Sequence, residues 1–562
     1  MINLVRSRVK PDRVEQILAA VTVALVMLGF AALLVTLIRT ALTSVIPFDM
    51  DEANHATDGW EVYHAFTSRS PRDLYRSVVE QSFYPPVHSF FVAAGYALGG
   101  PTLASSRLPT VVNLVFVLAL LVWLTTELAR KGANRQPGST LMIISASIVL
   151  AFALTSKIFI TNAVLAMVEM TGALLGLALA LVSARVEQQP GGNLHWRAVA
   201  GAAVMAVLAF LTKYSFGLFF LPALLAGLVT RTWPWRAGRR TWVAVVVAAA
   251  LYFVLLSSWW VATDGREMLL FFTDHPQYAP LWSRTNLFYQ ARVWYNGYSA
   301  SWAVASLTLL LAGVGAVCQW RLLAVRVAAW SVLAGVVVLT LSPTDEARHF
   351  LPLAPLVWLL AGLGLAEVLH WLRAQAWGEP VRVASVVVML VLLGWGAQQM
   401  VAALPTRLIT SLEGVPAHTQ LYTFALSRVD LDQPVLLIGD LYDQNNLLAV
   451  RWQAASLTNQ STWSLDIDYF PFEQYEHSLS RTNRKPQIAS IDPTFPRIHL
   501  NEVLERRHFA AIIEIKDLKN YFGPRANNPE DPLCGYPAQE MQLEGWIVIV
   551  YDVQTGSPVK CA

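Results

Sequence analysis

The sequence predicts a polytopic α-helical membrane protein that ends in a soluble mixed α/β domain. Of its 562 residues, 55% are hydrophobic and only 14% are charged, whereas soluble chains carry about 25% charged residues. Apolar runs long enough to span a bilayer, about 20 residues each, recur between residues 17 and 404. Beyond residue 404, short strand-like runs such as PVLLIGD and GWIVIVYD alternate with polar segments typical of loops.

The basic residues indicate how the chain is oriented. A formal net charge of +3, dispersed along the chain, does not suit nucleic-acid binding. Lys and Arg concentrate in cytoplasmic loops, so the basic N-terminal cluster predicts a cytoplasmic N-terminus. The first apolar run, 17–46, is too long for a signal peptide and lacks a small-residue cleavage site, which favours a retained span. Further basic segments, all predicted to be cytoplasmic, lie at 130–135, 185–197, 231–240, 321–326 and 370–382.

These orientations decide how the apolar stretch at 85–99 is interpreted. If PPVHSFFVAAGYALG crossed the membrane, the basic segment at 130–135 would lie outside, and its 15 residues are few for a span. We therefore predict a juxtamembrane or re-entrant segment there, within a first extracytoplasmic loop at about 47–107. The membrane domain then covers residues 1–404 with about eleven spans, and residues 405–562 form an extracytoplasmic domain of a multi-pass cell-membrane protein.

Several familiar kinds of site are absent from the sequence. It contains no G-x-x-x-x-G-K-[ST], H-E-x-x-H, paired C-x-x-C or G-x-S-x-G motif. The glycine pairs at 313/315 and 362/364 lie inside apolar runs, where they favour close helix packing. If the C-terminal region is extracytoplasmic, Cys534 and Cys561 are placed to form a disulfide; the sequence equally allows both to be free thiols.

The stretch FDMDEANHATDGW puts three carboxylates, those of Asp49, Asp51 and Glu52, directly after the first apolar run. A helix starting near Asp51 and lying on the membrane surface is predicted by apolar residues at helical spacing, namely Ala53, Ala56, Trp60 and Tyr63. Acids in a first turn complement the helix dipole, which is a purely structural explanation. Helix capping does not require three acids beside a bilayer. A chemical role for Asp51 is therefore the alternative to this structural explanation.

Further polar residues are predicted on the same outer side. Glu169 lies inside an apolar helix about two turns from the outer end, and an acid there is either functional or paired for structure. Lys213, in LTKYSFG, lies at a span end, where it either binds a ligand or extends to the lipid headgroups. The other candidates on this side are Tyr84, His88, Arg284, Arg292, Arg348 and His349. Together they suit a site where an anionic lipid headgroup meets a hydroxyl group.

The order of these motifs resembles the GT-C glycosyltransferases, specifically the branch of protein O-mannosyltransferases and bacterial aminoarabinose transferases. Over about residues 15–370 the motifs run DMDEANHA, YPPVH, SRLPTVV, AMVEMTGALLGLALAL, LTKYSFG and EARHFLPLAPLVWLLAG. Two departures bear on the sugar and the acceptor: His349 stands where a tyrosine is more usual, and Glu169 replaces an aspartate. The resemblance does not extend to the C-terminal domain.

The resemblance implies an inverting glycosyltransferase that moves a sugar from a polyprenyl or dolichyl phosphate to a hydroxyl of a protein, lipid or glycan outside the cell. Asp51 would be the general base, with Glu52 beside it, and Glu169 would orient donor or acceptor. We assign the leaving phosphate first to Lys213 and Arg348. The weaker candidates are His88, Arg284 and Arg292 for phosphate, and Tyr84 and His349 for substrate.

The resemblance implies no cofactor, and the minor alternative is a divalent metal held between Asp49, Asp51 and Glu169. Two other classes of function also remain open. A transporter or flippase of a lipid-linked saccharide would show inverted repeats with interrupted helices, and the sequence shows no such repeat. An envelope-assembly or binding protein would have a membrane part that has lost catalysis and would act through its C-terminal domain.

Overall fold

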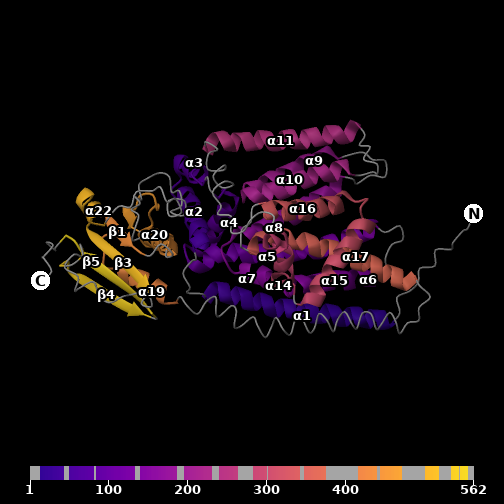
Figure 1. Ribbon diagram of the computed structural model, residues 1–562, viewed down its shortest axis with the longest axis horizontal. Helices are drawn as coiled ribbons and strands as arrows, with labels where there is room; N and C mark the ends of the chain where they lie inside the picture. Colours follow the sequence, from indigo (N-terminus) through magenta and orange to yellow (C-terminus); the bar gives the residue numbers. More distant parts are fainter. Residues whose placement is uncertain are drawn as a thin grey trace, which may run out of the picture.

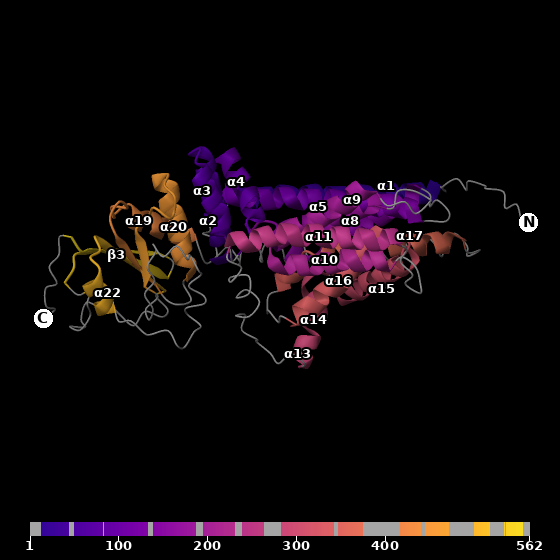
Figure 2. The same cartoon turned by 90° about the horizontal axis from the view of Figure 1, so that it is seen from above.

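The computed structural model describes residues 13–43, 50–81, 84–132, 139–186, 195–230, 239–263, 283–299, 301–341, 347–374, 416–439, 444–470, 500–517, 533, 535–543 and 545–554. These residues form a bundle of long helices and, at one end of it, an α/β region with a small sheet (Figure 1). Helices α2 (Met50–Thr67), α3 (Pro71–Val79) and α4 (Val87–Gly99) lie between the two parts (Figures 1 and 2). The predicted combination of membrane helices with a C-terminal α/β region is confirmed.

Six helices among the described residues are long and apolar enough to cross a membrane. They are α1 (Arg13–Thr43), α5 (Leu103–Gly132), α8 (Val168–Val186), α11 (Arg239–Thr263), α16 (Leu323–Leu341) and α17 (Ala354–Ala374). Shorter apolar helices are α6 (Ser139–Leu154), α9 (Trp196–Phe210) and α10 (Tyr214–Val229), and α14 (Tyr289–Gly297) forms a bent pair with α15 (Trp302–Cys318). The chain is a multi-pass membrane protein. The predicted total of about eleven spans includes one ending near residue 404, outside the described residues.

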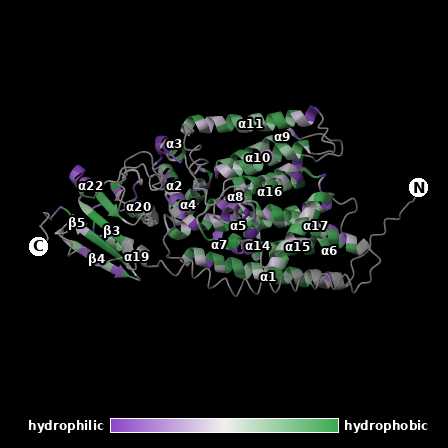
Figure 3. Cartoon of the chain, viewed as in Figure 1, coloured by the Kyte–Doolittle hydropathy of each residue, from purple (hydrophilic) through white to green (hydrophobic). Residues whose placement is uncertain are grey.

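The bundle has the surface of a membrane domain. Its helices are hydrophobic along most of their length, whereas hydrophilic residues are more frequent on α2 and α3 (Figure 3). Large apolar side chains are exposed on its helices, among them Leu28, Phe116, Val261 and Leu310. A helix satisfies its own backbone hydrogen bonds, so such helices are stable in lipid. Short connections in the described part are α7 (Lys157–Asn162), α13 (Arg284–Leu287) and the 3-10 turn η1 (Ala347–Phe350).

Glycines bring α15 and α17 into backbone contact. A Cβ atom at Gly315 would lie 2.0 Å from the Leu360 carbonyl oxygen, and one at Gly364 would lie 1.9 Å from that of Leu311. At Gly362 an added Cβ would meet Val149 at 2.4 Å. The predicted packing role is confirmed for these three glycines. At Gly313 a Cβ would meet no atom of the described residues within 4 Å, so the described part of the chain shows no packing contact there.

The stretch predicted not to cross the membrane contains α4, a helix of 13 residues. It is shorter than the six helices that pass the length test, and it packs against α2 and α5. At its start the Val87 N–H donates to the Leu211 carbonyl at 3.0 Å, just before α10. Helix α4 therefore lies against the start of α10, and its position relative to the membrane stays a prediction.

The C-terminal region is built on a five-stranded sheet in the order β2-β1-β3-β5-β4. Strand β1 (Val435–Ile438) runs parallel to β2 (Ile467–Phe470) and β3 (Ala511–Asp517), while β5 (Trp546–Asp552) runs antiparallel to β3 and β4 (Ala538–Leu543). The described helices of this region are α19 (Pro416–Leu426), α20 (Gln444–Thr458) and α22 (Leu500–Arg506). Both runs predicted as strands from the sequence are strands, β1 and β5. The predicted boundary at 404/405 lies outside the described residues.

The apolar face of α2 packs against the C-terminal region and not against a membrane surface, so the prediction for that face is wrong. Ala53, Ala56 and Trp60 are fully buried, and they share one hydrophobic core with residues of α4, α19, α20 and the sheet. Polar bonds accompany this packing. The Trp60 Nε1 donates to the Gln460 carbonyl at 2.9 Å, and Trp452 Nε1 donates to the Tyr96 hydroxyl at 2.9 Å.

A buried acid, Glu61, joins α2 to the segment that follows α20. Its carboxylate accepts hydrogen bonds from the Ser461 hydroxyl, the Thr462 N–H and the Thr462 hydroxyl, each at 2.6 Å. Burial raises the pKa of Glu61, and the three hydrogen bonds act in the opposite direction. Beside it, the Arg76 guanidinium of α3 lies over the Trp463 ring at 4.5 Å. These contacts fix the C-terminal region on the helix that begins with the acidic motif.

Candidate active site

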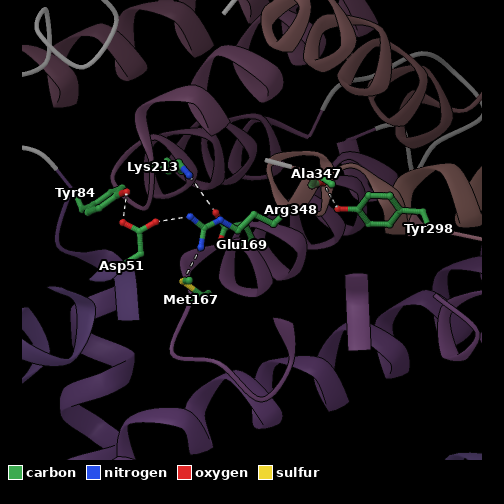
Figure 4. Close-up of polar contacts among 8 residues, drawn as sticks. All are labelled: Asp51, Tyr84, Met167, Glu169, Lys213, Tyr298, Ala347 and Arg348. Atoms are coloured by element: carbon green, nitrogen blue, oxygen red, sulfur yellow. Dashed lines mark hydrogen bonds and ion pairs between the residues drawn. The ribbon is translucent and has the colours of Figure 1, made fainter. Parts of the chain in front are cut away.

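Four charged residues from distant parts of the sequence lie together in one cluster (Figure 4). Arg348 Nη2 donates to Asp51 Oδ2, and Lys213 Nζ donates to Glu169 Oε1 at 3.1 Å. Lys213, Arg348 and also His349 lie close enough to act electrostatically on Glu169. The structure thus brings together Asp51, Glu169, Lys213 and Arg348 as two adjacent ion pairs.

Three of the four residues lie at the beginnings of α-helices, and Arg348 lies in a short turn that precedes one. Asp51 is in the first turn of α2 and Glu169 is the second residue of α8, closer to the helix end than the two turns predicted. Lys213 has extended backbone (φ −157°, ψ 131°) and precedes α10, while Arg348 lies in η1, before α17. Since helix N-termini carry partial positive charge, these ends favour an anion between them.

The carboxylate of Asp51 is held by side chains on both oxygens. Tyr84 donates its hydroxyl to Asp51 Oδ1 at 3.1 Å, opposite the bond from Arg348. Arg348 also contacts the Met167 sulfur at 3.5 Å, and the Tyr298 hydroxyl donates to the Ala347 carbonyl at 2.9 Å, which anchors the turn before Arg348. The Asp51 side chain remains 18% exposed. This acid is therefore oriented by neighbours but accessible to a ligand.

Glu52, the next residue, has a different environment. It forms a two-pronged ion pair with Arg107 (Nε–Oε1 3.0 Å, Nη2–Oε2 2.9 Å), and both side chains are only 2% exposed. Its Oε1 also accepts from the Ala166 N–H at 2.7 Å. Glu52 thus ties the start of α2 to α5 and to the segment before α8. Arg107 was not among the predicted site residues, although an arginine entering an apolar run requires a partner.

His88 lies in the first turn of α4 and is 1% exposed. Burial lowers its pKa to about 4, so at neutral pH the ring carries no charge. It can still donate a hydrogen bond to a phosphate, but it adds no positive charge there. Its ring packs at 5.2 Å from that of His55, which in turn lies 4.7 Å from the Tyr84 ring. Like Arg107, His55 was not among the predicted site residues.

The other candidates fall into three groups. His349 lies half-buried in η1 beside Arg348. Arg284 on α13 and Arg292 on α14 are exposed, and no contact described in the structure joins them to the two ion pairs. Asp49, Cys534 and Cys561 lie outside the described residues. Within the described part, no group of three His, Cys, Asp or Glu residues could hold a metal ion.

The fold is similar to that of two solved structures of one protein. They are of ArnT from Cupriavidus metallidurans, bound to undecaprenyl phosphate and in the apo state. The first matches with a TM-score of 0.61 and 14% identity, over 95% of this chain and 98% of ArnT. The second matches with a TM-score of 0.61 and 15% identity, over 96% and 99%.

A third match is the oligosaccharyltransferase AglB from Archaeoglobus fulgidus, with a TM-score of 0.48 and 12% identity over 94% of this chain and 74% of that one. No family model and no curated protein matches the sequence. The two ArnT structures confirm, at the level of the fold, the resemblance noted in the motifs. Because the ArnT match covers nearly the whole chain, it includes the C-terminal region, for which the sequence alone indicated no relative.

Proposed function

We propose that the protein is an integral-membrane glycosyltransferase that moves a sugar from a polyprenyl-phosphate donor to a hydroxyl acceptor. The observation that carries this proposal is the meeting of two carboxylate–cation pairs, Asp51–Arg348 and Glu169–Lys213, at converging helix starts. Two cations beside helix N-termini suit a phosphate, and a partly exposed carboxylate suits a hydroxyl proton. The similarity in fold to ArnT, which was solved with undecaprenyl phosphate, supports the same donor class.

In this mechanism Asp51 is the general base. As it takes the proton of the acceptor hydroxyl, the acceptor oxygen forms a bond to the anomeric carbon of the sugar. The bond from that carbon to the phosphate oxygen breaks on the opposite side, so the configuration inverts and the lipid phosphate leaves with the electron pair. Lys213 and Arg348 stabilise the charge that develops on the phosphate, an effect that is strong in a desolvated site.

The ion pair between Asp51 and Arg348 implies that the donor binds before the acceptor proton is transferred. Without a donor, Arg348 is bonded to Asp51 and occupies one of its two carboxylate oxygens. A bound phosphate competes for the same guanidinium. We therefore infer that donor binding draws Arg348 away from Asp51, which then takes the acceptor proton while Tyr84 still orients it. The distribution of basic residues in the sequence supports an extracytoplasmic site in the cell membrane.

The direct test uses purified protein in nanodiscs with polyprenyl phosphates that carry radiolabelled sugars. We expect label to leave the lipid and to appear on a hydroxyl acceptor with inverted configuration. Movement of intact lipid-linked sugar across the bilayer without cleavage would contradict the proposal and favour a flippase. Retention of all label on the lipid with every donor and acceptor would favour an assembly protein.

Removing the phosphate-binding cations should weaken use of the donor. Lys213→Met and Arg348→Met should each lower kcat/KM for the donor by about 10²-fold, and the double variant should lose less than the product of the two. Lys213→Met also leaves the buried Glu169 charge unpaired, which destabilises the fold. A Glu169→Gln/Lys213→Met variant, with unfolding measured in parallel, separates this loss of stability from the loss of phosphate binding.

The matched control for these variants is Lys131→Met, which removes a partly exposed lysine at the far end of α5. Among the described residues, its ion pair is with Glu127. It should leave donor kinetics unchanged. Normal turnover in the Lys213→Met/Arg348→Met protein would remove both residues from the phosphate site. Lys213 would then be a structural partner of Glu169.

A further inference from the structure

The side chain of Tyr84 lies along one turn of α2. Its hydroxyl donates to Asp51 Oδ1 at 3.1 Å (Figure 4), and its ring packs against the ring of His55, with 4.7 Å between the two centroids. Asp51 and His55 are four residues apart on this helix, so their side chains share one face of it. One phenol therefore bridges the proposed general base and a histidine one turn away.

The ring of His55 is held on a second side as well. His55 is 2% exposed, and its ring meets that of His88 edge-on, with 5.2 Å between the centroids. His88 Nδ1 lies 2.9 Å from Thr171 Oγ1 of α8, which accepts from Asn113 of α5 at 3.0 Å. Both centroid distances are typical of packed aromatic pairs. The position of His55 is thus set through residues of α4, α8 and α5.

This arrangement matters most when a donor is bound. In the proposed mechanism Arg348 then leaves Asp51 for the phosphate. Lys213, whose Nζ lies 5.9 Å from the centre of the Tyr84 ring, binds the same phosphate. The contacts of Tyr84 with Asp51 and His55 involve neither cation. A catalytic group misplaced by about 1 Å can lose about 10²-fold in rate, so the base needs a support that donor binding does not remove.

We propose that His55 is a positioning residue for Asp51: its ring holds the Tyr84 hydroxyl on the carboxylate while the phosphate engages the cations. This inference rests on the proposed function, in which Asp51 takes the acceptor proton. A residue before a proline is restricted to extended backbone. For Tyr84, which precedes Pro85, the direction of the side chain remains to be fixed, and the ring of His55 fixes it.

The first test is His55→Ala, assayed with the donor and acceptor found active in the labelled-sugar assay. It should lower kcat by about 10–100-fold. The KM for the donor and the binding of undecaprenyl phosphate alone should stay unchanged, because the phosphate-binding cations keep their places. Rates refer to the folded fraction, measured by thermal unfolding. A merely structural residue would lower that fraction and leave kcat of the folded protein unchanged.

Two conservative variants locate the effect. His55→Phe keeps a ring against Tyr84, so it should recover most of the wild-type kcat. Tyr84→Phe keeps the ring contact but removes the hydroxyl, so it should lower kcat at least as much as His55→Ala. The double variant His55→Ala/Tyr84→Phe should be no slower than Tyr84→Phe alone, because the effects of residues that act through one contact do not multiply.

The matched control is His64→Ala. His64 lies on the same helix, and its ring packs on that of Trp60, with 5.9 Å between the centroids. The substitution should leave kcat unchanged. A fall in kcat as large as that of His55→Ala would mean that any loss of packing on α2 slows transfer, and it would overturn the specific role of His55.

The outcomes separate the inference from the proposed function. A wild-type kcat in His55→Ala, or a His55→Phe protein as slow as His55→Ala, would overturn the inference alone. Multiplying losses in the double variant would do the same. If His55→Ala does not fold, Tyr84→Phe still decides, since a wild-type kcat there means that the phenol does not orient the base. If the wild-type protein cleaves no lipid-linked sugar, the proposed function fails, and the inference falls with it.

Discussion

Asp51→Asn should lower the rate of sugar transfer by about 10²–10⁴-fold in a protein that folds normally and still binds the lipid donor. Asparagine keeps the size of the side chain, and its Oδ1 can still accept a hydrogen bond from Tyr84 or Arg348. It is also about as good as aspartate at a helix start. A purely structural role for Asp51 therefore predicts nearly full activity, whereas a general base cannot be replaced by an amide.

The measurement is transfer of labelled sugar in nanodiscs, with donor binding and thermal unfolding followed on the same samples. Asp73→Asn is a matched control, because Asp73 is an exposed acid in the first turn of the neighbouring helix α3. It should behave as wild type. An Asp51→Asn protein that transfers sugar at the wild-type rate would remove the general base from the mechanism.

Arg107→Met should have the largest effect on stability, a loss of about 3–5 kcal/mol. The substitution leaves the Glu52 carboxylate buried without its charged partner, at the point where α2 meets α5 and the segment before α8. Because Asp51 precedes Glu52 on the same turn, sugar transfer should fall as well. Unfolding in detergent by heat or denaturant, with the activity of the folded fraction, measures both effects.

Two controls show whether the buried charge is the cause. Adding Glu52→Gln to Arg107→Met removes that charge and keeps an oxygen for the Ala166 N–H, so it should recover part of the stability. Arg130→Met breaks an exposed pair with Glu127 and should cost only about 0–1 kcal/mol. If Arg107→Met is no more costly than Arg130→Met, Glu52 does not depend on this partner.

Much of the cluster was predictable because charges are rare in apolar sequence. Glu169 and Lys213 attracted attention as ionisable groups within or beside membrane helices, where an unpaired charge is costly, and the structure pairs them with each other. Asp51 and Arg348 stood out for the same reason, beside the ends of apolar runs. The strands β1 and β5 were also predictable, since their apolar runs are too short for helices.

The partners were harder to predict than the residues, because periodicity shows which face of a helix is buried but not what covers it. Trp60 and its apolar neighbours were expected to face lipid, and they face protein. From the sequence, Arg107 marks only the start of a span. The structure adds its contact with Glu52, 55 positions away in the sequence. Gly313 and Gly315 lie in the same apolar sequence. Of these two, Gly315 is the one at a described helix crossing, where α15 meets α17.

The shared core of α2, α4 and the C-terminal region constrains how these two parts of the chain can evolve. Trp60 and Tyr96 belong to the first hundred residues, and Trp452 and Gln460, which they contact, belong to the last part of the chain. A chimera that joined this membrane part to the C-terminal region of a distant relative would bring together two surfaces that never adapted to each other. Helix α2, which carries Asp51, and the C-terminal sheet should therefore co-evolve.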